Sequence, residues 1–373
     1  MFRLSNLLES VVSGKKARVL DGSIAIWNFT NRCNLNCLHC YSKSTLDEID
    51  VLSTEVIKKT ILQMKACGVK FIIFSGGEPL VREDIFELAM FCKEHGIVTY
   101  LSSNGLYFKK SNIEKIVTTF DYIGVSIDGD ELTHDHFRGL KGAFSQSIAA
   151  IKMALDAGGR VGVRFTLTKE TINSLAFIFE LAEKENISKI YISHLVYSGR
   201  GLDNLKMDLS KEERREAVSY ILDKAFAYHH EKRGIEIVTG NMEMDAIVFY
   251  ERFVQEYPQH AKEMLERLRS WGGNSAGRKL LNINAQGDVK PDPFFPFTVG
   301  NILEKDFAEI WEGGELLEKL RHHPRELGGI CSNCNVIDIC NGGSRSRAYA
   351  VSGDLWAEDP SCYLTQQQRE KQW

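Results

Sequence analysis

The pattern of apolar and polar positions predicts alternating strands and helices over roughly the first 240 residues. Apolar, β-rich runs form six predicted strands and a weaker seventh, at residues 24–29, 70–74, 97–101, 122–127, 161–167, 189–195 and 235–238. Amphipathic helical patterns lie between them, such as residues 53–67, where Ser53 is suited to cap the helix. Serial strand–helix units imply parallel strands joined by right-handed crossovers. We therefore expect an α/β fold built as a partial (β/α)6 barrel of the TIM type, with its chemistry at the carboxyl ends of the strands.

The pattern changes after about residue 239. A charged helical stretch is expected over residues 241–270, a hairpin turning at residues 286–288, and a helix over residues 307–320. The tail beyond Gly328 holds four cysteines among short loops, so a bound metal group is expected to stabilise it. Four parts are predicted: an N-terminal extension (1–22) with a short helical pattern, the barrel (23–238), a bridging region (239–310) and a small cysteine-rich C-terminal domain (311–373).

Composition and charge narrow the class of protein. The 373 residues carry a net charge of −4, and no apolar run approaches the ~20 residues that span a bilayer. We expect a cytoplasmic monomer without a signal peptide and without nucleic-acid or membrane partners. Because only about 23 residues precede the first predicted strand, we expect no separate N-terminal peptide-recognition domain.

The nine cysteines divide into three groups. An odd count in a long chain without a secretion signal argues against a disulfide framework. Cys67 and Cys92 lie in helical patterns and are expected to be core thiols. The other seven form two clusters near opposite ends of the chain, which is a pattern typical of metal sites.

The first cluster, Cys33-x3-Cys37-x2-Cys40, directly follows the first predicted strand. Three thiolates in one loop can bind one face of an iron–sulfur cube and leave its fourth iron without a protein ligand. Zinc, with His39 as a fourth ligand, is the alternative. Tyr41 follows the last cysteine, where its ring could pack on a flat ligand or simply on the loop.

The order of motifs resembles the radical S-adenosylmethionine superfamily. Ser75-Gly76-Gly77-Glu78-Pro79 follows the second predicted strand, as a Gly-Gly-Glu motif does in that family. The resemblance implies a 4Fe-4S cluster on Cys33, Cys37 and Cys40 that binds S-adenosyl-L-methionine. It also implies that this cofactor is contacted by residues at several strand ends: Tyr41, Gly76, Gly77, Glu78, Ser103, Asn104, Ser126, Asp128, Arg164 and Leu195. Among these, the backbone of the Gly-Gly-Glu motif and Glu78 would receive the ammonium group, and Arg164 would bind the carboxylate.

The second cluster, Cys331-x2-Cys334-x5-Cys340 with Cys362, resembles the SPASM-type domain of many such enzymes. The full pattern carries more cysteines, whereas this chain has Asp292 and Ser344 at two of the expected positions. We expect one auxiliary 4Fe-4S cluster, with zinc as the alternative and no metal role for Asp292 or Ser344.

Further strings, such as residues 133–138 and 356–360, resemble the radical enzymes of heme d1 and alternative heme biosynthesis. That resemblance implies an iron tetrapyrrole substrate, 12,18-didecarboxysiroheme, whose propionate side chains are removed through a 5′-deoxyadenosyl radical. It also implies a low-potential electron donor of the ferredoxin or flavodoxin type. Substrate contacts are expected from Arg200, Arg138, His134, His136 and His194, with Arg278 as a further cation. The alternatives are a related decarboxylation of the alternative heme pathway, a peptide substrate, or a zinc-stabilised binding module without catalysis.

Overall fold

The computed structural model describes residues 1–14 and 22–372. The predicted N-terminal helical pattern forms α1 (Leu4–Val12), whereas the end of the extension predicted over residues 1–22 lies partly outside the described residues. No described helix is long and apolar enough to cross a membrane.

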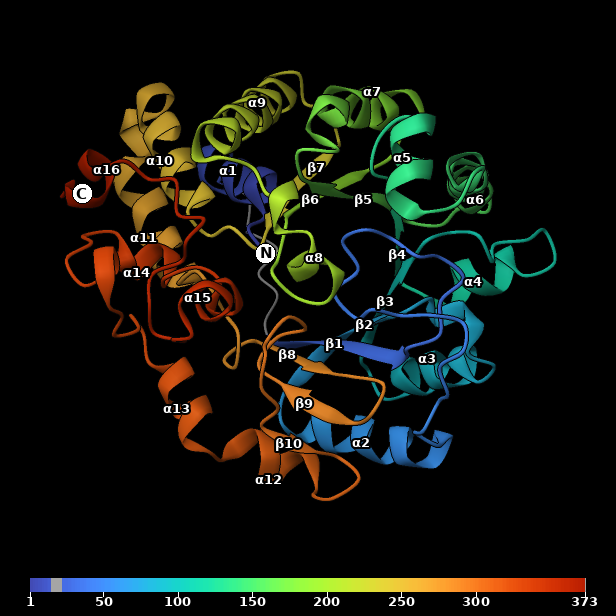
Figure 1. The fold of residues 1–373 in the computed structure, drawn as a ribbon. Helices are drawn as coiled ribbons and strands as arrows, with labels where there is room; N and C mark the ends of the chain where they lie inside the picture. The colour runs from blue at the N-terminus through green and yellow to red at the C-terminus, as the bar shows by residue number, and fades with distance from the viewer. Residues whose placement is uncertain (15–21, 373) are drawn as a thin grey trace.

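One ten-stranded sheet organises the molecule, in the order β10-β9-β8-β1-β2-β3-β4-β5-β6-β7. Strands β1 to β7 pair in parallel with their neighbours in sequence, as the predicted series of crossovers requires. The strands are β1 (Ser23–Thr30), β2 (Val69–Gly76), β3 (Val98–Ser103), β4 (Tyr122–Ser126), β5 (Val161–Leu167), β6 (Lys189–His194), β7 (Glu236–Gly240), β8 (Leu280–Ile283), β9 (Asp288–Lys290) and β10 (Gly300–Asn301). Figure 1 shows them as an open arc, the geometry of a partial barrel.

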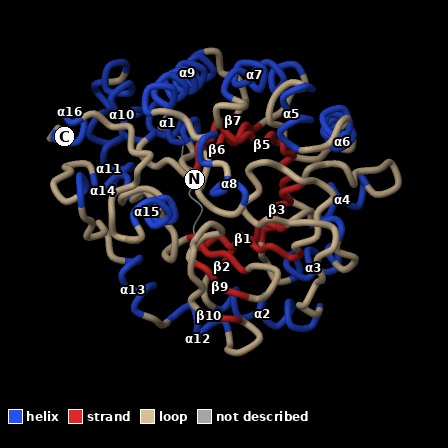
Figure 2. The backbone as a smooth tube through the Cα atoms, viewed as in Figure 1, coloured by secondary structure: helices blue, strands red, loops and turns tan. Residues whose placement is uncertain are grey.

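Helices cover the outer side of this arc, so the strands lie inside a helical layer (Figure 2). After α1 they are α2 (Thr54–Ala66), α3 (Ile85–Glu94), α4 (Ile113–Thr119), α5 (Glu131–Arg138), α6 (Ala143–Asp156), α7 (Leu175–Lys184) and α9 (Lys211–His230). The short α8 (Arg200–Asp203) lies inside the arc in Figure 1. Most later helices gather at the opening of the arc: α10 (Asp245–Glu256), α11 (Ala261–Trp271), α13 (Glu315–Arg321), α14 (Ile337–Cys340), α15 (Arg345–Ser352) and α16 (Gln366–Glu370). The remaining one, α12 (Phe307–Glu312), packs against α2 beside β10.

The seven predicted strands are confirmed, but two predicted helices are wrong as single elements. The stretch 241–270 is divided into α10 and α11 at Pro258, which cannot continue a helix because it lacks an N–H. The stretch 307–320 is divided into α12 and α13 at Gly313 and Gly314, and Gly314 has a φ of +97°. The Ser53 cap is confirmed, since its hydroxyl accepts the Val56 N–H at 3.3 Å.

The predicted hairpin is also confirmed, and it has a place that the pattern did not predict. Its first strand, β8, pairs in parallel with β1 on the side away from β2. The Asn282 side chain strengthens this pairing by donating to the Ile26 carbonyl at 2.6 Å. The strand that leads into the cysteine loop is therefore an interior strand of the sheet.

The N-terminal residues pair with β7, the last strand in the order of the sheet. Phe2 forms an antiparallel bridge with Thr239 in β7, with N–H···O distances of 2.7 and 2.9 Å. One continuous apolar core extends from the sheet to the C-terminal segment and includes Cys92, Cys334 and Cys340. The buried Cys92 is thus a core thiol, as predicted, while Cys67 is half-buried at the end of α2.

Candidate functional site

The loop that carries Cys33, Cys37 and Cys40 leaves the carboxyl end of β1 and is held from several sides. The Cys33 N–H donates to the Thr45 carbonyl at 3.0 Å, which closes the loop on itself. Arg200 binds it from the segment after β6: its backbone N–H donates to the Cys40 carbonyl at 2.8 Å and its Nε to the Cys37 carbonyl at 2.7 Å. The fixed loop places all three cysteines on the wall of one cavity.

The three thiols differ in electrostatic environment. Burial raises the pKa of Cys33 to about 12 and also raises the pKa of Cys37. Burial acts on Cys40 too, but hydrogen bonds from Ser42 and Ser44 and the charge of Arg200 outweigh it and lower the pKa of that thiol. An iron–sulfur cluster takes cysteine as thiolate, and iron bonded to the sulfurs would replace the lost hydration. The loop therefore fits a cluster bound through three thiolates.

The Gly-Gly-Glu turn after β2 lies directly against this loop. The Gly77 N–H donates to the Thr30 carbonyl and the Glu78 N–H to the Arg32 carbonyl, at 2.9 and 2.8 Å. A side chain at Gly77 would lie 2.2 Å from the Arg32 oxygen, so only glycine permits this approach. Both Gly76 and Gly77 line the cavity beside the cysteines.

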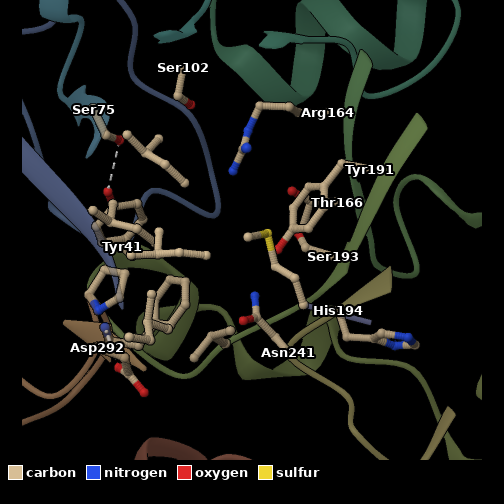
Figure 3. Close-up of a pocket in the computed structure, with 18 of the residues that line it drawn as sticks. Tyr41, Ser75, Ser102, Arg164, Thr166, Tyr191, Ser193, His194, Asn241 and Asp292 are labelled. Atoms are coloured by element: carbon tan, nitrogen blue, oxygen red, sulfur yellow. Dashed lines mark hydrogen bonds between the residues drawn. The ribbon is translucent and has the colours of Figure 1, made fainter. Parts of the chain in front are cut away.

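The cavity has a volume of about 470 Å³ and lies inside the arc of strands. Arg164 projects into it from β5, opposite Tyr41 and Asp292 in Figure 3. The Arg164 guanidinium lies 4.7 Å from the centre of the Tyr191 ring and forms no ion pair with any described residue. An arginine without an acidic partner, half-buried in a cavity, is suited to bind an anionic group such as a carboxylate.

Most predicted cofactor residues line the cavity: Tyr41, Gly76, Gly77, Ser103, Asn104, Ser126, Arg164 and Leu195. The Tyr41 hydroxyl donates to the Asn28 side chain at 3.0 Å, which fixes its ring at the cavity edge. Contact of these residues with S-adenosylmethionine stays a prediction.

Two predicted cofactor contacts, Glu78 and Asp128, are instead buried beneath the cavity wall, outside its described lining. The Glu78 carboxylate accepts hydrogen bonds from the Ser103 hydroxyl and the Asn104 N–H, at 2.9 and 2.8 Å. Burial raises the pKa of Glu78 to about 7 in spite of these bonds. Asp128 forms an ion pair with Arg138 at 2.5 Å. Both carboxylates position the loops that line the cavity.

The predicted substrate residues lie in different places, and their contact with a substrate stays a prediction. Arg200 binds carbonyl groups of the cysteine loop, and His136 is exposed on α5; neither is among the described residues that line the cavity. His134 is buried and accepts the Asp128 N–H at 3.1 Å, so it fixes a turn. Arg278, likewise outside the described lining, donates to the Gly272 carbonyl.

Arg138 and His194 do line the cavity, but both already have partners. His194 Nε2 lies 3.3 Å from Asp245 Oδ2, and that carboxylate also accepts the Tyr363 hydroxyl at 2.8 Å. Arg138 forms an ion pair with Asp128 and donates a hydrogen bond to the Cys37 sulfur.

Other cavity residues were missed. Thr166 lies two residues after Arg164 in β5 and therefore points to the same face, and Tyr191 and Ser193 are the partners of Arg164 and Thr166 in β6. The side-chain period of two along a strand is a signal that the sequence contains. Asn241, Glu243 and Asp292 come from segments beyond the predicted barrel, and no local pattern places them at the site. Burial raises the pKa of Asp292 to about 6, and the charge of Glu243 adds to this effect.

The second cysteine set forms a separate site. Cys331, Cys334, Cys340 and Cys362 all line one small cavity of about 10 Å³. Burial raises the pKa of Cys331 to about 12 and that of Cys362 to about 11, and each thiolate would repel its neighbours. Four thiols gathered in so little space fit a bound cluster that neutralises them. Ser344 has another role, since it caps α15 by accepting the Arg347 N–H.

A buried ion pair links the two sites. Arg347, which is fully buried, donates to Asp359 at 2.7 Å and to the carbonyl of Leu195 at 3.1 Å. Asp359 lines the small cavity with the four cysteines, and Leu195 lines the large one. The Arg347–Asp359 pair thus connects the lining of one cavity to the lining of the other.

Within the described parts of the chain, no group of three or more His, Cys, Asp or Glu side chains is arranged to hold a single metal ion. Ligands of a four-iron cluster each bind a different iron and need not converge on one point.

Comparisons with known proteins match both halves of this arrangement. A family model described as "Radical SAM superfamily" matches residues 27–182, and the SPASM model, described as "Iron-sulfur cluster-binding domain", matches residues 275–335. Pre-heme d1 synthase of Dinoroseobacter shibae is 38% identical over 98% of this chain and 93% of its own length. Fe-coproporphyrin III synthase of Methanosarcina barkeri is 37% identical over 92% of this chain and 88% of its own. AdoMet-dependent heme synthase of the same organism is 32% identical, with 90% and 95% covered.

Solved structures show the same fold. SuiB of Streptococcus suis bound to its precursor peptide SuiA has a TM-score of 0.73, with 18% identity over 92% of this chain and 76% of that one. The anSMEcpe protein with bound AdoMet and a peptide has a TM-score of 0.68, with 18% identity and 90% and 92% covered.

Proposed function

Because the chain belongs to the radical SAM superfamily, we propose that it uses radical chemistry to modify an iron tetrapyrrole in the biosynthesis of a heme-type cofactor. The observation that carries the proposal is the similarity, over nearly the whole chain, to pre-heme d1 synthase. The cavity of about 470 Å³ adds support, since it offers apolar walls and one arginine without an acidic partner.

The enzyme takes S-adenosylmethionine and a 4Fe-4S cluster in its radical SAM domain and a further iron–sulfur cluster in its SPASM domain. The zinc alternatives and the non-catalytic binding module are therefore wrong. We assign the first cluster to Cys33, Cys37 and Cys40, and the second to Cys331, Cys334, Cys340 and Cys362. When bound, the first cluster and S-adenosylmethionine supply a 5′-deoxyadenosyl radical; the organic chemistry belongs to the cofactors.

The chain itself contributes binding, orientation and exclusion of water. Arg164 would bind the carboxylate of S-adenosylmethionine, while the backbone at Gly76 and Gly77 would accept its ammonium group. Glu78 would fix the turn after β2 through its hydrogen bond from the Asn104 N–H, and Asp128 would fix the end of β5 by accepting the Thr166 N–H at 2.9 Å. The substrate would occupy the part of the cavity lined by Asn241, Glu243 and Asp292.

The finer proposal is removal of propionate side chains from 12,18-didecarboxysiroheme. The 38% identity to pre-heme d1 synthase favours it. A second candidate is decarboxylation in the alternative heme pathway, which the 37% identity to Fe-coproporphyrin III synthase favours almost equally. We further propose a cytoplasmic monomer that receives electrons from a ferredoxin- or flavodoxin-type donor.

Product mass analysis distinguishes these reactions. Anaerobically reconstituted enzyme is incubated with S-adenosylmethionine, dithionite and 12,18-didecarboxysiroheme, and in parallel with iron coproporphyrin III. Loss of propionates from the first substrate supports the proposal. Loss of acetate carboxyls supports the second candidate, whereas vinyl formation on the coproporphyrin indicates a heme synthase. Formation of 5′-deoxyadenosine without any modified tetrapyrrole would contradict all three and favour a peptide substrate.

A further inference from the structure

The cysteine loop packs against the C-terminal end of α5. The Leu38 N–H donates to the Phe137 carbonyl at 3.0 Å, and the His39 ring stacks on the Phe137 ring with centres 4.4 Å apart. The helix ends at Gly139, which has a φ of +72°, and a side chain there would lie 3.0 Å from the Asn36 carbonyl oxygen. The close packing leaves Arg138, the last helical residue, directly beside the loop.

Arg138 contacts a cysteine sulfur from this position. One of its terminal nitrogens, Nη1, lies 3.6 Å from Cys37 Sγ, and the other, Nη2, lies 2.5 Å from Asp128 Oδ2. Asp128 is fully buried, and its other oxygen accepts the Thr166 N–H at 2.9 Å. Arg138 itself is only 8% exposed. The guanidinium is therefore fixed between a carboxylate and a sulfur that we assign to the radical-generating cluster.

The positive charge of Arg138 affects the electron affinity of a cluster that is bound to Cys37. Reduction adds one negative charge, and a cation bonded to a ligand sulfur stabilises the reduced form more than the oxidised form. The effect is strong where water is excluded, because screening is weak there. The negative charge of Asp128 acts in the opposite direction. Arg138 and Asp128 therefore have opposing effects on the electron affinity of a cluster bound to Cys37.

We propose that Arg138 is a positioning residue that raises the reduction potential of the radical-generating cluster through its contact with Cys37, and that Asp128 limits this rise. Arg200 provides a contrast. It lies beside the same loop, yet its guanidinium donates to the Cys37 carbonyl at 2.7 Å and, among the described residues, donates to no sulfur; its charge acts on Cys40 only through space.

The test is a redox titration of the reconstituted, full-length enzyme, followed by electron paramagnetic resonance. The signal that changes when S-adenosylmethionine is added identifies the first cluster. We expect Arg138→Gln to lower its midpoint potential and Asp128→Asn to raise it. A tenfold change in the ratio of reduced to oxidised cluster at fixed solution potential corresponds to about 59 mV for a one-electron couple. Arg200→Gln, the matched control, should shift the potential less and mainly lower iron content.

Two further variants keep the test decisive if a single substitution prevents cluster loading. Arg138→Lys retains the charge and should shift the potential less than Arg138→Gln. The double variant Arg138→Gln/Asp128→Asn removes both charges and should lie between the two single variants. Equal potentials in wild type and Arg138→Gln at equal iron content would overturn the proposal. So would shifts of the same sign in Arg138→Gln and Asp128→Asn, because opposite charges cannot act alike on a potential.

Discussion

The two cysteine sites differ in how the chain builds them. In the first, three cysteines come from one loop of eight residues and face a cavity of about 470 Å³. In the second, four cysteines come from separate turns of the C-terminal segment and enclose about 10 Å³. The first leaves room for ligands beside its cysteines, whereas the second is almost closed. The number of thiols and the open space beside them therefore distinguish a site that can admit further ligands from a site that cannot.

The largest effect that we expect comes from removing one cysteine of each set. Cys40→Ala should reduce formation of 5′-deoxyadenosine at least about a hundredfold, equal to ~2.7 kcal/mol of activation free energy, because the cluster loses a ligand. Cys340→Ala should retain cleavage of S-adenosylmethionine but lose tetrapyrrole product. Chromatography of both products and iron analysis measure this, with the core variant Cys92→Ala as control. Equal loss of cleavage in both variants would erase the functional distinction between the sites.

The next effect concerns the ion pair that joins the sites. Arg347→Met leaves the buried Asp359 without its cation, which we expect to destabilise the fold by about 3–5 kcal/mol. Burial acts against the charge of Asp359, but Arg347 outweighs it and lowers the pKa of that carboxyl in the native enzyme. Urea unfolding of the apo-protein measures the change. Lys319→Ala, from an exposed pair with Glu315, is the control and should show no measurable change. A similar midpoint for both variants would mean that the two sites are not held together through Arg347.

A smaller effect is expected at the first site alone, the open cavity that Cys33, Cys37 and Cys40 line. Arg164→Gln should raise the KM for S-adenosylmethionine by roughly tenfold to a hundredfold, because a charge-assisted hydrogen bond contributes about 1.5–3 kcal/mol. Arg164→Lys should lie between this variant and wild type, since lysine cannot bind a carboxylate through two parallel bonds. Initial rates of 5′-deoxyadenosine formation give KM and kcat separately. Arg160→Gln, exposed before β5, should leave KM unchanged. A loss confined to kcat would contradict a binding role.

The smallest effect is a pH dependence of stability, which comes from Glu78 beside the first site. Burial raises the pKa of Glu78 from 4.5 to about 7, so the folded protein binds this proton more tightly than the unfolded chain. The stabilisation is complete below about pH 4.5 and is lost as the pH rises through 7. We expect Tm to fall between pH 5 and pH 8 in the wild type, and to fall by a few degrees less in Glu78→Gln. The conversion is about 2–4 °C of Tm per kcal/mol of stability. The exposed Glu114→Gln should leave the slope unchanged. Parallel curves for wild type and Glu78→Gln would contradict the assignment.

Much of the fold could be predicted because its signals are local. The strands follow from apolar runs, the Ser53 cap from one hydroxyl, and the cysteine loop from spacing and its place after β1. The signals for the breaks at Pro258 and Gly313-Gly314 are equally local, but the helical periodicity continues across them and so predicts one helix where the structure has two.

The remainder depends on partners far apart in sequence. The sequence shows the charges of Arg200 and Arg138 but not their protein partners, the Cys37 carbonyl and Asp128. Asp292 and Asn241 reach the cavity only through the packing of the C-terminal segment against the barrel. Position in the tertiary structure, and not residue type, decides these roles.

The pairing of β8 with β1 has a consequence for biosynthesis of the enzyme. Asn282 and Ile26, which form one of its hydrogen bonds, are 256 residues apart. At roughly 5–20 residues per second, a ribosome needs about 13–50 s to supply β8 after β1 has been made. Until then β1 presents an unpaired edge, and such edges can recruit strands from other chains. The strand that leads into the cysteine loop is therefore completed late, and cluster insertion on the nascent chain would take place while β1 still lacks its neighbour β8.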